Sequence, residues 1–233
     1  MTFEPPTQLV RFLLELRKSI LGLGLAAAGG TIALSFFSPF LLLILTAHLG
    51  QKLAFFTVAE PFLALVQLGF FFTLFAFMPY ILYCIWRALA QVFHLAPASS
   101  YWFVGIACGL FYFGALFCYF ITLPFGVKFL LGYESVQLKA VISVSRFVSF
   151  ISIFVLGFGI IFELPLFMVL GAKIGLWNHE VFCQYRRHAI LAITIIAAIL
   201  TPTPDAVNMM LMGIPLYLLY EAGIVVMRFL VRT

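Results

Sequence analysis

The chain has 233 residues, of which 65% are hydrophobic and only 9% are charged, and its net charge is +5. Soluble domains are about 25% charged, so this composition excludes an ordinary water-exposed globule and indicates a surface solvated by lipid. The basic residues lie in short segments between apolar runs, and no more than two of them are adjacent in the sequence. That pattern favours control of membrane topology over binding of nucleic acid.

Residues 7–19 predict a short amphipathic helix that lies along the membrane surface. Apolar residues recur at the spacing of one helical face: Leu9, Phe12, Leu13 and Leu16. Arg11, Glu15 and Lys18 fall on the opposite side, where Glu15 can pair with either basic neighbour. Glu15 is therefore half of a solvated ion pair or a carboxylate offered to a basic partner from the cytosol.

Six apolar runs follow, and a helix needs about 20 apolar residues to cross about 30 Å of hydrocarbon. Four runs are long enough: Ile20–Leu45, Phe62–Trp86, Tyr101–Pro124 and Phe147–Leu170. Thr201-Pro202-Thr203-Pro204-Asp205 divides the remainder into two short runs, His188–Leu200 and Ala206–Met227. We predict one membrane domain over residues 1–233, all α-helical, with six spans. The short final pair is expected to cross a thinned bilayer; a re-entrant hairpin is the alternative.

The distribution of basic residues predicts that both termini are cytoplasmic. With the N-terminus inside, the inner segments hold nine of the 13 basic residues: Arg11, Arg17, Lys18, Arg87, Lys173, Arg186, Arg187, Arg228 and Arg232. The outer segments hold the other four: Lys52, Lys128, Lys139 and Arg146. Because Lys and Arg accumulate on the cytoplasmic side, we expect an N-in, C-in topology.

Glu163 lies well inside the fourth run. An ionisable group at that depth costs at least about 2.5–3.5 kcal/mol on insertion scales and indicates a functional site. Pro165 cannot donate a backbone N–H, so we expect a kinked helix with Glu163 on a concave wall. The alternative is a structural carboxyl that accepts a hydrogen bond from a hydroxyl on a neighbouring helix.

Three other acidic residues have structural explanations. Glu60 precedes Pro61 at the start of the second span, where the positive end of the helix dipole favours it. Asp205 is placed to cap the sixth helix. Glu221, next to Tyr220 near the inner end of the sixth run, is expected to be a structural carboxylate close to Arg228.

The sequence contains no catalytic, nucleotide-binding or metal-binding motif. G-x-S-x-G, H-E-x-x-H, Walker A and G-x-G-x-x-G are all absent. The four cysteines form no C-x-x-C pair, and no ligand spacing relates the four histidines: His48, His94, His179 and His188. We therefore expect no enzyme, no metal and no cofactor. Gly105 and Gly109 form a G-x-x-x-G, which indicates a close helix-packing face.

Six motifs in order resemble the TatC family, the six-span core subunit of the twin-arginine protein translocase. They are Glu15-Leu16-Arg17; Glu60-Pro61-Phe62; Pro79 with Tyr83 and Trp86; Gly114 to Phe120 with Pro124; Phe158-Gly159 and Phe162-Glu163 with Pro165; and Thr201-Pro202 with Asp205, followed by Pro215 and Leu219-Tyr220-Glu221. The resemblance covers nearly the whole chain.

The resemblance implies export of folded proteins across the bacterial inner membrane, powered by the proton-motive force. In this family the cytoplasmic face binds signal peptides that carry two adjacent arginines, and single-span TatA and TatB partners dock along the membrane-embedded surface of a multimeric complex. By resemblance, Glu15 with Arg17 would meet the arginines, and Glu163 with Pro165 would lie in a lipid-open wall. Other motif positions are Glu60, Pro61, Pro79, Trp86, Asp205 and Glu221.

The chain departs from the family pattern at polar positions. The segment Gln91–Ser100 lacks the family's second acidic residue and offers His94 as a weaker candidate for the signal peptide. Phe12, Cys84 and Met209 each replace a polar residue of the family. The alternative function is a proton-coupled small-solute transporter with Glu163 as the titrating group. An intramembrane enzyme lacks every expected nucleophile and metal ligand.

Overall fold

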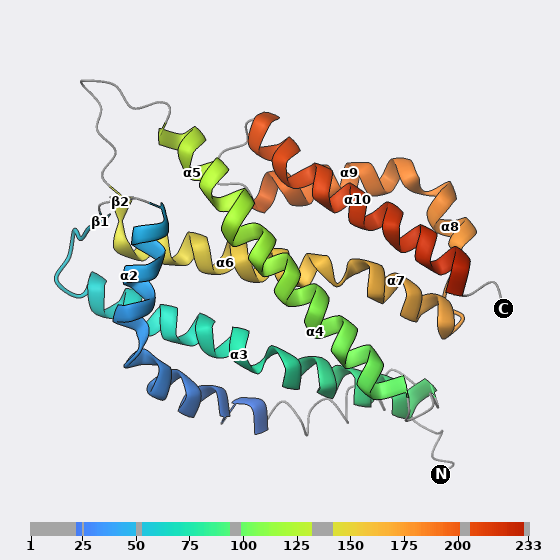
Figure 1. The fold of residues 1–233 in the computed structure, drawn as a ribbon, viewed down its shortest axis with the longest axis horizontal. Helices are drawn as coiled ribbons and strands as arrows, with labels where there is room; N and C mark the ends of the chain where they lie inside the picture. The colour runs from blue at the N-terminus through green and yellow to red at the C-terminus, as the bar shows by residue number, and fades with distance from the viewer. Residues whose placement is uncertain are drawn as a thin grey trace, which may run out of the picture. The chain divides into compact units, whose positions relative to one another are not determined.

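The computed structural model describes residues 22–24, 26–49, 53–93, 99–131, 142–200 and 206–230, and nearly all of them are helical (Figure 1). After the helical segment Gly22–Ser35, the elements are α2 (Ser38–Leu49), β1 (Leu53–Ala54), α3 (Glu60–Phe93), α4 (Ser99–Phe117), the π-helix η1 (Cys118–Thr122), α5 (Leu123–Leu131), β2 (Ile142–Ser143), α6 (Val144–Phe162), α7 (Leu164–Lys173), α8 (His179–Gln184), α9 (Arg186–Leu200) and α10 (Ala206–Leu230). They form two compact units: residues 1–109 with 142–149, and residues 110–141 with 150–233.

Within the described residues, four helical segments are long and apolar enough to cross a membrane: Glu60–Gln91, Tyr101–Lys128, Val144–Lys173 and Met212–Phe229. A fifth is present if the bent pair Gly22–Ser35 and Ser38–Leu49 is one span. Helix α9 has 15 residues, or about 22 Å at 1.5 Å per residue, which is less than the hydrocarbon thickness. The chain is a multi-pass helical membrane protein, as its composition predicts.

The first apolar run, predicted as one helix from Ile20 to Leu45, is divided by a bend of 69°. The segment Gly22–Ser35 ends at a turn, and α2 starts at Ser38. Pro39 explains the new start, because a proline in the first turn of a helix loses no intrahelical hydrogen bond. The Ser38 hydroxyl, fully buried, donates back to the Leu34 carbonyl oxygen at 3.2 Å.

The first unit is held together by α3 and the start of α6. Ala64 and Leu68 from α3 pack with Val144 and Val148 from α6, and leucines of α2 and β1 cover them. At membrane depth the Gln67 amide donates to the Ser149 hydroxyl oxygen at 2.8 Å. The short parallel strands β1 and β2 pair at the adjoining end of this unit, with Leu53 opposite Ile142 and Ala54 opposite Ser143.

In the second unit, α4 runs through η1 into α5 without leaving the helical path. Pro124 explains the π-helical turn, because it has no backbone N–H and its ring would clash with the carbonyl four residues earlier. The preceding N–H, of Leu123, donates instead to the Cys118 carbonyl oxygen, five residues back. The turn therefore absorbs the proline inside a continuous span.

Close helix packing in the second unit uses glycines that differ from the predicted pair. A Cβ atom on Gly114 would lie 2.5 Å from the Phe162 ring, and one on Gly159 would lie 2.5 Å from Phe111. The backbone of α4 therefore meets α6 directly through two aromatic rings. By contrast, a Cβ on Gly105 or Gly109 would meet no atom of the described residues within 4 Å.

Candidate functional site

Glu163 occupies the single residue between α6 and α7. Its own N–H donates to the Ile160 carbonyl oxygen at 3.1 Å, three residues back rather than four. Its carbonyl oxygen accepts the Phe167 N–H at 3.0 Å, so the helix resumes at once. Pro165 is the cause of the break, because no N–H at position 165 can reach the carbonyl of Ile161. The sequence thus places the carboxyl at a helix interruption inside a 30-residue apolar segment.

The Glu163 side chain is 1% exposed, and neither carboxyl oxygen has a hydrogen-bond partner among the described residues. The flanking residues are tightly packed: Phe162 against Gly114 of α4, and the Pro165 backbone 3.2 Å from a Cβ built on Gly223 of α10. A buried polar group without a partner costs about 1–3 kcal/mol. Such a group in a native chain calls for a functional explanation.

A second residue in the same unit has an unpartnered side-chain oxygen. The Thr122 hydroxyl, in the last residue of η1, is buried and forms no hydrogen bond among the described residues. Both groups therefore lie where a helix is irregular next to a proline. The structural alternative for Glu163, a hydrogen bond from a hydroxyl on a neighbouring helix, is not formed by any residue that the structure describes.

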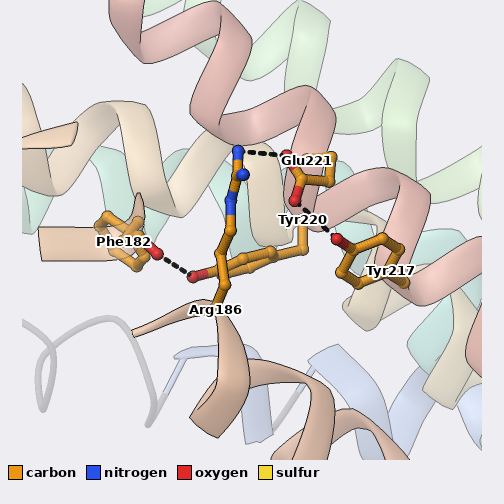
Figure 2. A network of polar contacts seen from close by, with 5 residues as sticks. All are labelled: Phe182, Arg186, Tyr217, Tyr220 and Glu221. Atoms are coloured by element: carbon orange, nitrogen blue, oxygen red, sulfur yellow. Dashed lines mark hydrogen bonds and ion pairs between the residues drawn. The ribbon is translucent and has the colours of Figure 1, made fainter. Parts of the chain in front are cut away.

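A polar cluster in the second unit joins α8, α9 and α10 (Figure 2). The Arg186 guanidinium donates to one Glu221 carboxylate oxygen at 2.9 Å, and the Tyr217 hydroxyl donates to the other at 2.8 Å. The Tyr220 hydroxyl donates to the Phe182 carbonyl oxygen at 2.8 Å. Glu221 is thus a structural carboxylate, but its ion-pair partner is Arg186 and not Arg228.

Glu60 accepts several hydrogen bonds within the first unit. Its carboxylate accepts the Phe56 N–H at 2.7 Å, the Ser143 hydroxyl, and the Ser145 N–H at 3.4 Å. These bonds tie the start of α3 to the start of α6. The sequence explains Glu60 by the helix dipole alone, and the structure shows that its carboxylate also bonds to two other segments of the chain.

Three further motif residues lie in α3. Pro61 is the second residue of α3, and Pro79 lies inside that helix. Trp86 is buried and stacks on Phe103 of α4 with ring centroids 4.1 Å apart.

Three predicted functional positions and one predicted cap lie outside the described residues. The helix predicted over residues 7–19, with Glu15 and Arg17, precedes the first described residue, His94 falls between α3 and α4, and Asp205 directly precedes α10. These residues remain predictions from the sequence.

Sequence reasoning missed Ser143 and Tyr217. Tyr217 could have been found, because it stands four residues before Glu221, the spacing at which helical side chains meet. Ser143 gives no local signal, because its partner Glu60 is 83 residues away in the chain.

Comparison with known proteins identifies the family. The model of the family described as Sec-independent protein translocase protein (TatC) matches residues 11–215. The chain is 31% identical to the TatC of Carboxydothermus hydrogenoformans over 97% of this chain and 95% of that protein. It is 34% identical to the TatC of Aquifex aeolicus over 78% of this chain and 76% of the relative.

Two crystal structures described as the twin-arginine translocase receptor TatC have the same fold. One superposes with a TM-score of 0.82 at 31% identity and covers 94% of this chain and 98% of its own. The other, determined in the detergent DDM, superposes with a TM-score of 0.80 at 30% identity and covers 93% and 99%. The motifs, the family match and the shared fold agree, and the chain belongs to the TatC family of Sec-independent protein translocase components.

Proposed function

We propose that this chain is the core and receptor subunit of a twin-arginine translocase in a bacterial inner membrane. In this role it binds twin-arginine signal peptides at the cytoplasmic face and organises TatA- and TatB-like single-span proteins for export driven by the proton-motive force. Family membership and the receptor description of the solved relatives support this role.

The observation that carries the proposal is the buried, unpartnered carboxyl of Glu163. A polar group kept at membrane depth without an internal partner is suited to a polar group on an incoming helix, which would satisfy both oxygens in a low-dielectric site. The interruption before Pro165 supports this role, because proline has no N–H to donate to the Ile161 carbonyl oxygen, close to the carboxyl in the chain.

The proposed signal-peptide site consists of Glu15 and Arg17, with His94 as a weaker contributor. A carboxylate binds a guanidinium through two parallel hydrogen bonds, which suits a substrate marked by adjacent arginines. The missing acid in Gln91–Ser100 leaves Glu15 as the acidic residue proposed for this recognition.

The proposed topology has six spans with both termini cytoplasmic. Helices α9 and α10 would be the fifth and sixth spans, and the bent pair before α3 would be the first. The excess of basic residues in the inner segments supports this orientation.

The test is complementation of a strain that lacks TatC, scored by export of a folded, cofactor-bearing reporter. We expect the chain to restore export and Glu163→Gln to abolish it, with crosslinking of the precursor to the chain retained. Glu15→Ala should instead weaken that crosslinking. Glu180→Gln is the matched control, because Glu180 is an exposed carboxylate on α8. Export by the Glu163→Gln variant at the control level would contradict the role of this carboxyl.

The same buried carboxyl would serve a proton-coupled small-solute transporter. That function predicts pH-driven uptake into liposomes by this protein alone, lost in Glu163→Gln. Restored export without any uptake removes it, whereas uptake without export would displace the translocase proposal.

A further inference from the structure

An open apolar cavity of about 490 Å³ lies between α9 and α10, entirely within the second unit. Its size falls within the range of about 300–1,000 Å³ that is typical of small-molecule sites. The lining includes Ile190 and Ile193 from α9, and Met210, Gly213 and Leu218 from α10. The Thr194 hydroxyl in the wall already donates to the Ile190 carbonyl oxygen at 2.8 Å. The cavity therefore suits a hydrocarbon chain.

One end of this cavity is polar. Tyr217 lines the wall, and its hydroxyl is held by Glu221, which is paired with Arg186 (Figure 2). The Arg186 side chain is 47% exposed, and this ion pair engages one nitrogen of a guanidinium that has five N–H donors. The remaining donors suit an anionic group placed at the mouth of the cavity.

Cations outnumber acids at this end of the helix pair. Arg187 follows Arg186 on α9, and Arg228 lies two turns beyond Glu221 on α10; both are exposed. Among the described residues, the carboxylates there are Glu221, already paired, and Glu180 on α8, which packs against α9 and α10. The complementary ligand has an apolar tail and an acidic head.

In the proposed topology α9 is the fifth span, and its length would bring these charges to the level of lipid headgroups. A helix about 22 Å long is shorter than the hydrocarbon core, and a short span is accommodated by local thinning and by snorkelling of its flanking basic residues. Arginines at its first turn are then within reach of phosphate groups.

We propose that the α9–α10 cavity binds one anionic glycerophospholipid of the bilayer. An acyl chain fills the cavity, and the phosphate bonds to Arg186 with Arg187 and Arg228 nearby. The site takes its lipid from the leaflet that contains the α8–α9 end of the second unit.

The experiment is native mass spectrometry of the full chain, released from detergent after titration with phosphatidylglycerol or with phosphatidylcholine of the same acyl chains. Gly213→Leu fills the cavity, because a Cβ at Gly213 meets no described atom within 4 Å. Gly105→Leu is the matched control, a glycine with equal space on α4. Arg187→Gln with Arg228→Gln removes two exposed arginine charges proposed to lie near the phosphate, and Lys128→Gln is its control on α5.

We expect phosphatidylglycerol to be retained at least about five-fold more tightly than phosphatidylcholine, the ratio given by about 1 kcal/mol for one basic residue near the surface. Gly213→Leu should lower retention of phosphatidylglycerol at least five-fold, and the double arginine variant, which keeps Arg186, should lower the preference for phosphatidylglycerol over phosphatidylcholine. Both controls should behave as the parent. The arginine variants alter only exposed side chains, so they keep the test decisive if Gly213→Leu fails to fold.

Equal retention of the two lipids would overturn the proposal, and so would equal loss in both glycine variants. A dimer peak that Gly213→Leu abolishes, without any lipid adduct, would assign the cavity to a second copy of the chain. That outcome would also overturn it.

Discussion

Glu163 combines two costs that natural chains seldom carry together: depth in a membrane span and the absence of a partner for either oxygen. No described residue donates a hydrogen bond to either carboxyl oxygen. The proline two residues later explains the interruption of the helix but not the choice of a carboxyl. The residue is therefore better explained by what it receives from another helix than by the stability of this chain.

Replacing this carboxyl should separate stability from function. Glu163→Met keeps an unbranched side chain of similar length and removes the unpartnered oxygens, so we expect the free energy of unfolding to rise by about 1–3 kcal/mol. Export should nevertheless be lost. Unfolding of the purified protein by titration with a denaturing detergent measures the free energy of unfolding. The control is Glu180→Met, at an exposed position. A marked loss of stability would show that the carboxyl holds the helices together.

Glycine substitutions on α4 test the helix crossing. Gly114→Ala places a methyl group 2.5 Å from the Phe162 ring, and we expect overpacking to cost about 1–3 kcal/mol of unfolding free energy. Gly109→Ala on the same helix has free space and should be neutral or stabilising by about 0.5–1 kcal/mol. Thermal unfolding of the two variants side by side measures the difference. Equal stabilities would mean that the crossing adjusts freely.

At the scale of elements, apolar length and proline were sufficient to place most helices. The second, third and fourth predicted runs each lie inside one long apolar helical segment, and the division before Asp205 separates α9 from α10. The bend at Ser38-Pro39 was missed although its signal is present, because the run is apolar on both sides. The π-helical turn before Pro124 was also missed, because periodicity cannot say which hydrogen bonds a proline displaces.

Contacts between distant segments could not be predicted from apolar run length or from the positions of prolines. The pairing of β1 with β2 and the bonds from Glu60 to Ser143 join residues more than 80 positions apart. Only the folded chain brings these two segments together. The sequence predicts that a helix starts at Glu60. The structure shows in addition that the Glu60 carboxylate accepts hydrogen bonds from Phe56, Ser143 and Ser145.

Removing the hydrogen bond between Ser143 and Glu60 should destabilise the chain locally. Ser143→Ala removes a donor to the carboxylate, together with an oxygen that accepts the Arg146 N–H at the start of α6. Because both bonds are lost, hydrogen exchange over residues 53–60 should be faster than in the parent. Ser145→Ala is the control, because Ser145 reaches Glu60 through its backbone N–H. Faster exchange in both variants alike would contradict this assignment.

At the scale of the whole molecule, the family and its helical membrane fold followed from six short motifs in order. The structure and the relatives confirm both. Individual motif residues serve different purposes. Trp86 stacks on Phe103, Glu60 and Glu221 bond to other segments, and of these three carboxylates only Glu163 lacks a hydrogen bond in the part of the chain that is described.

The proposed orientation can be tested with a cysteine that the chain already has. Cys183 is exposed on α8, in the segment between α7 and α9 that positive charge assigns to the cytoplasm. Val58, 95% exposed before α3, falls on the opposite side by the same rule. In intact cells a membrane-impermeant maleimide should label Val58→Cys and leave Cys183 unmodified, and in inverted vesicles the labelling should be reversed. Labelling of Cys183 from outside would invert the topology and move the proposed signal-peptide site to the wrong face for a receptor of cytosolic precursors.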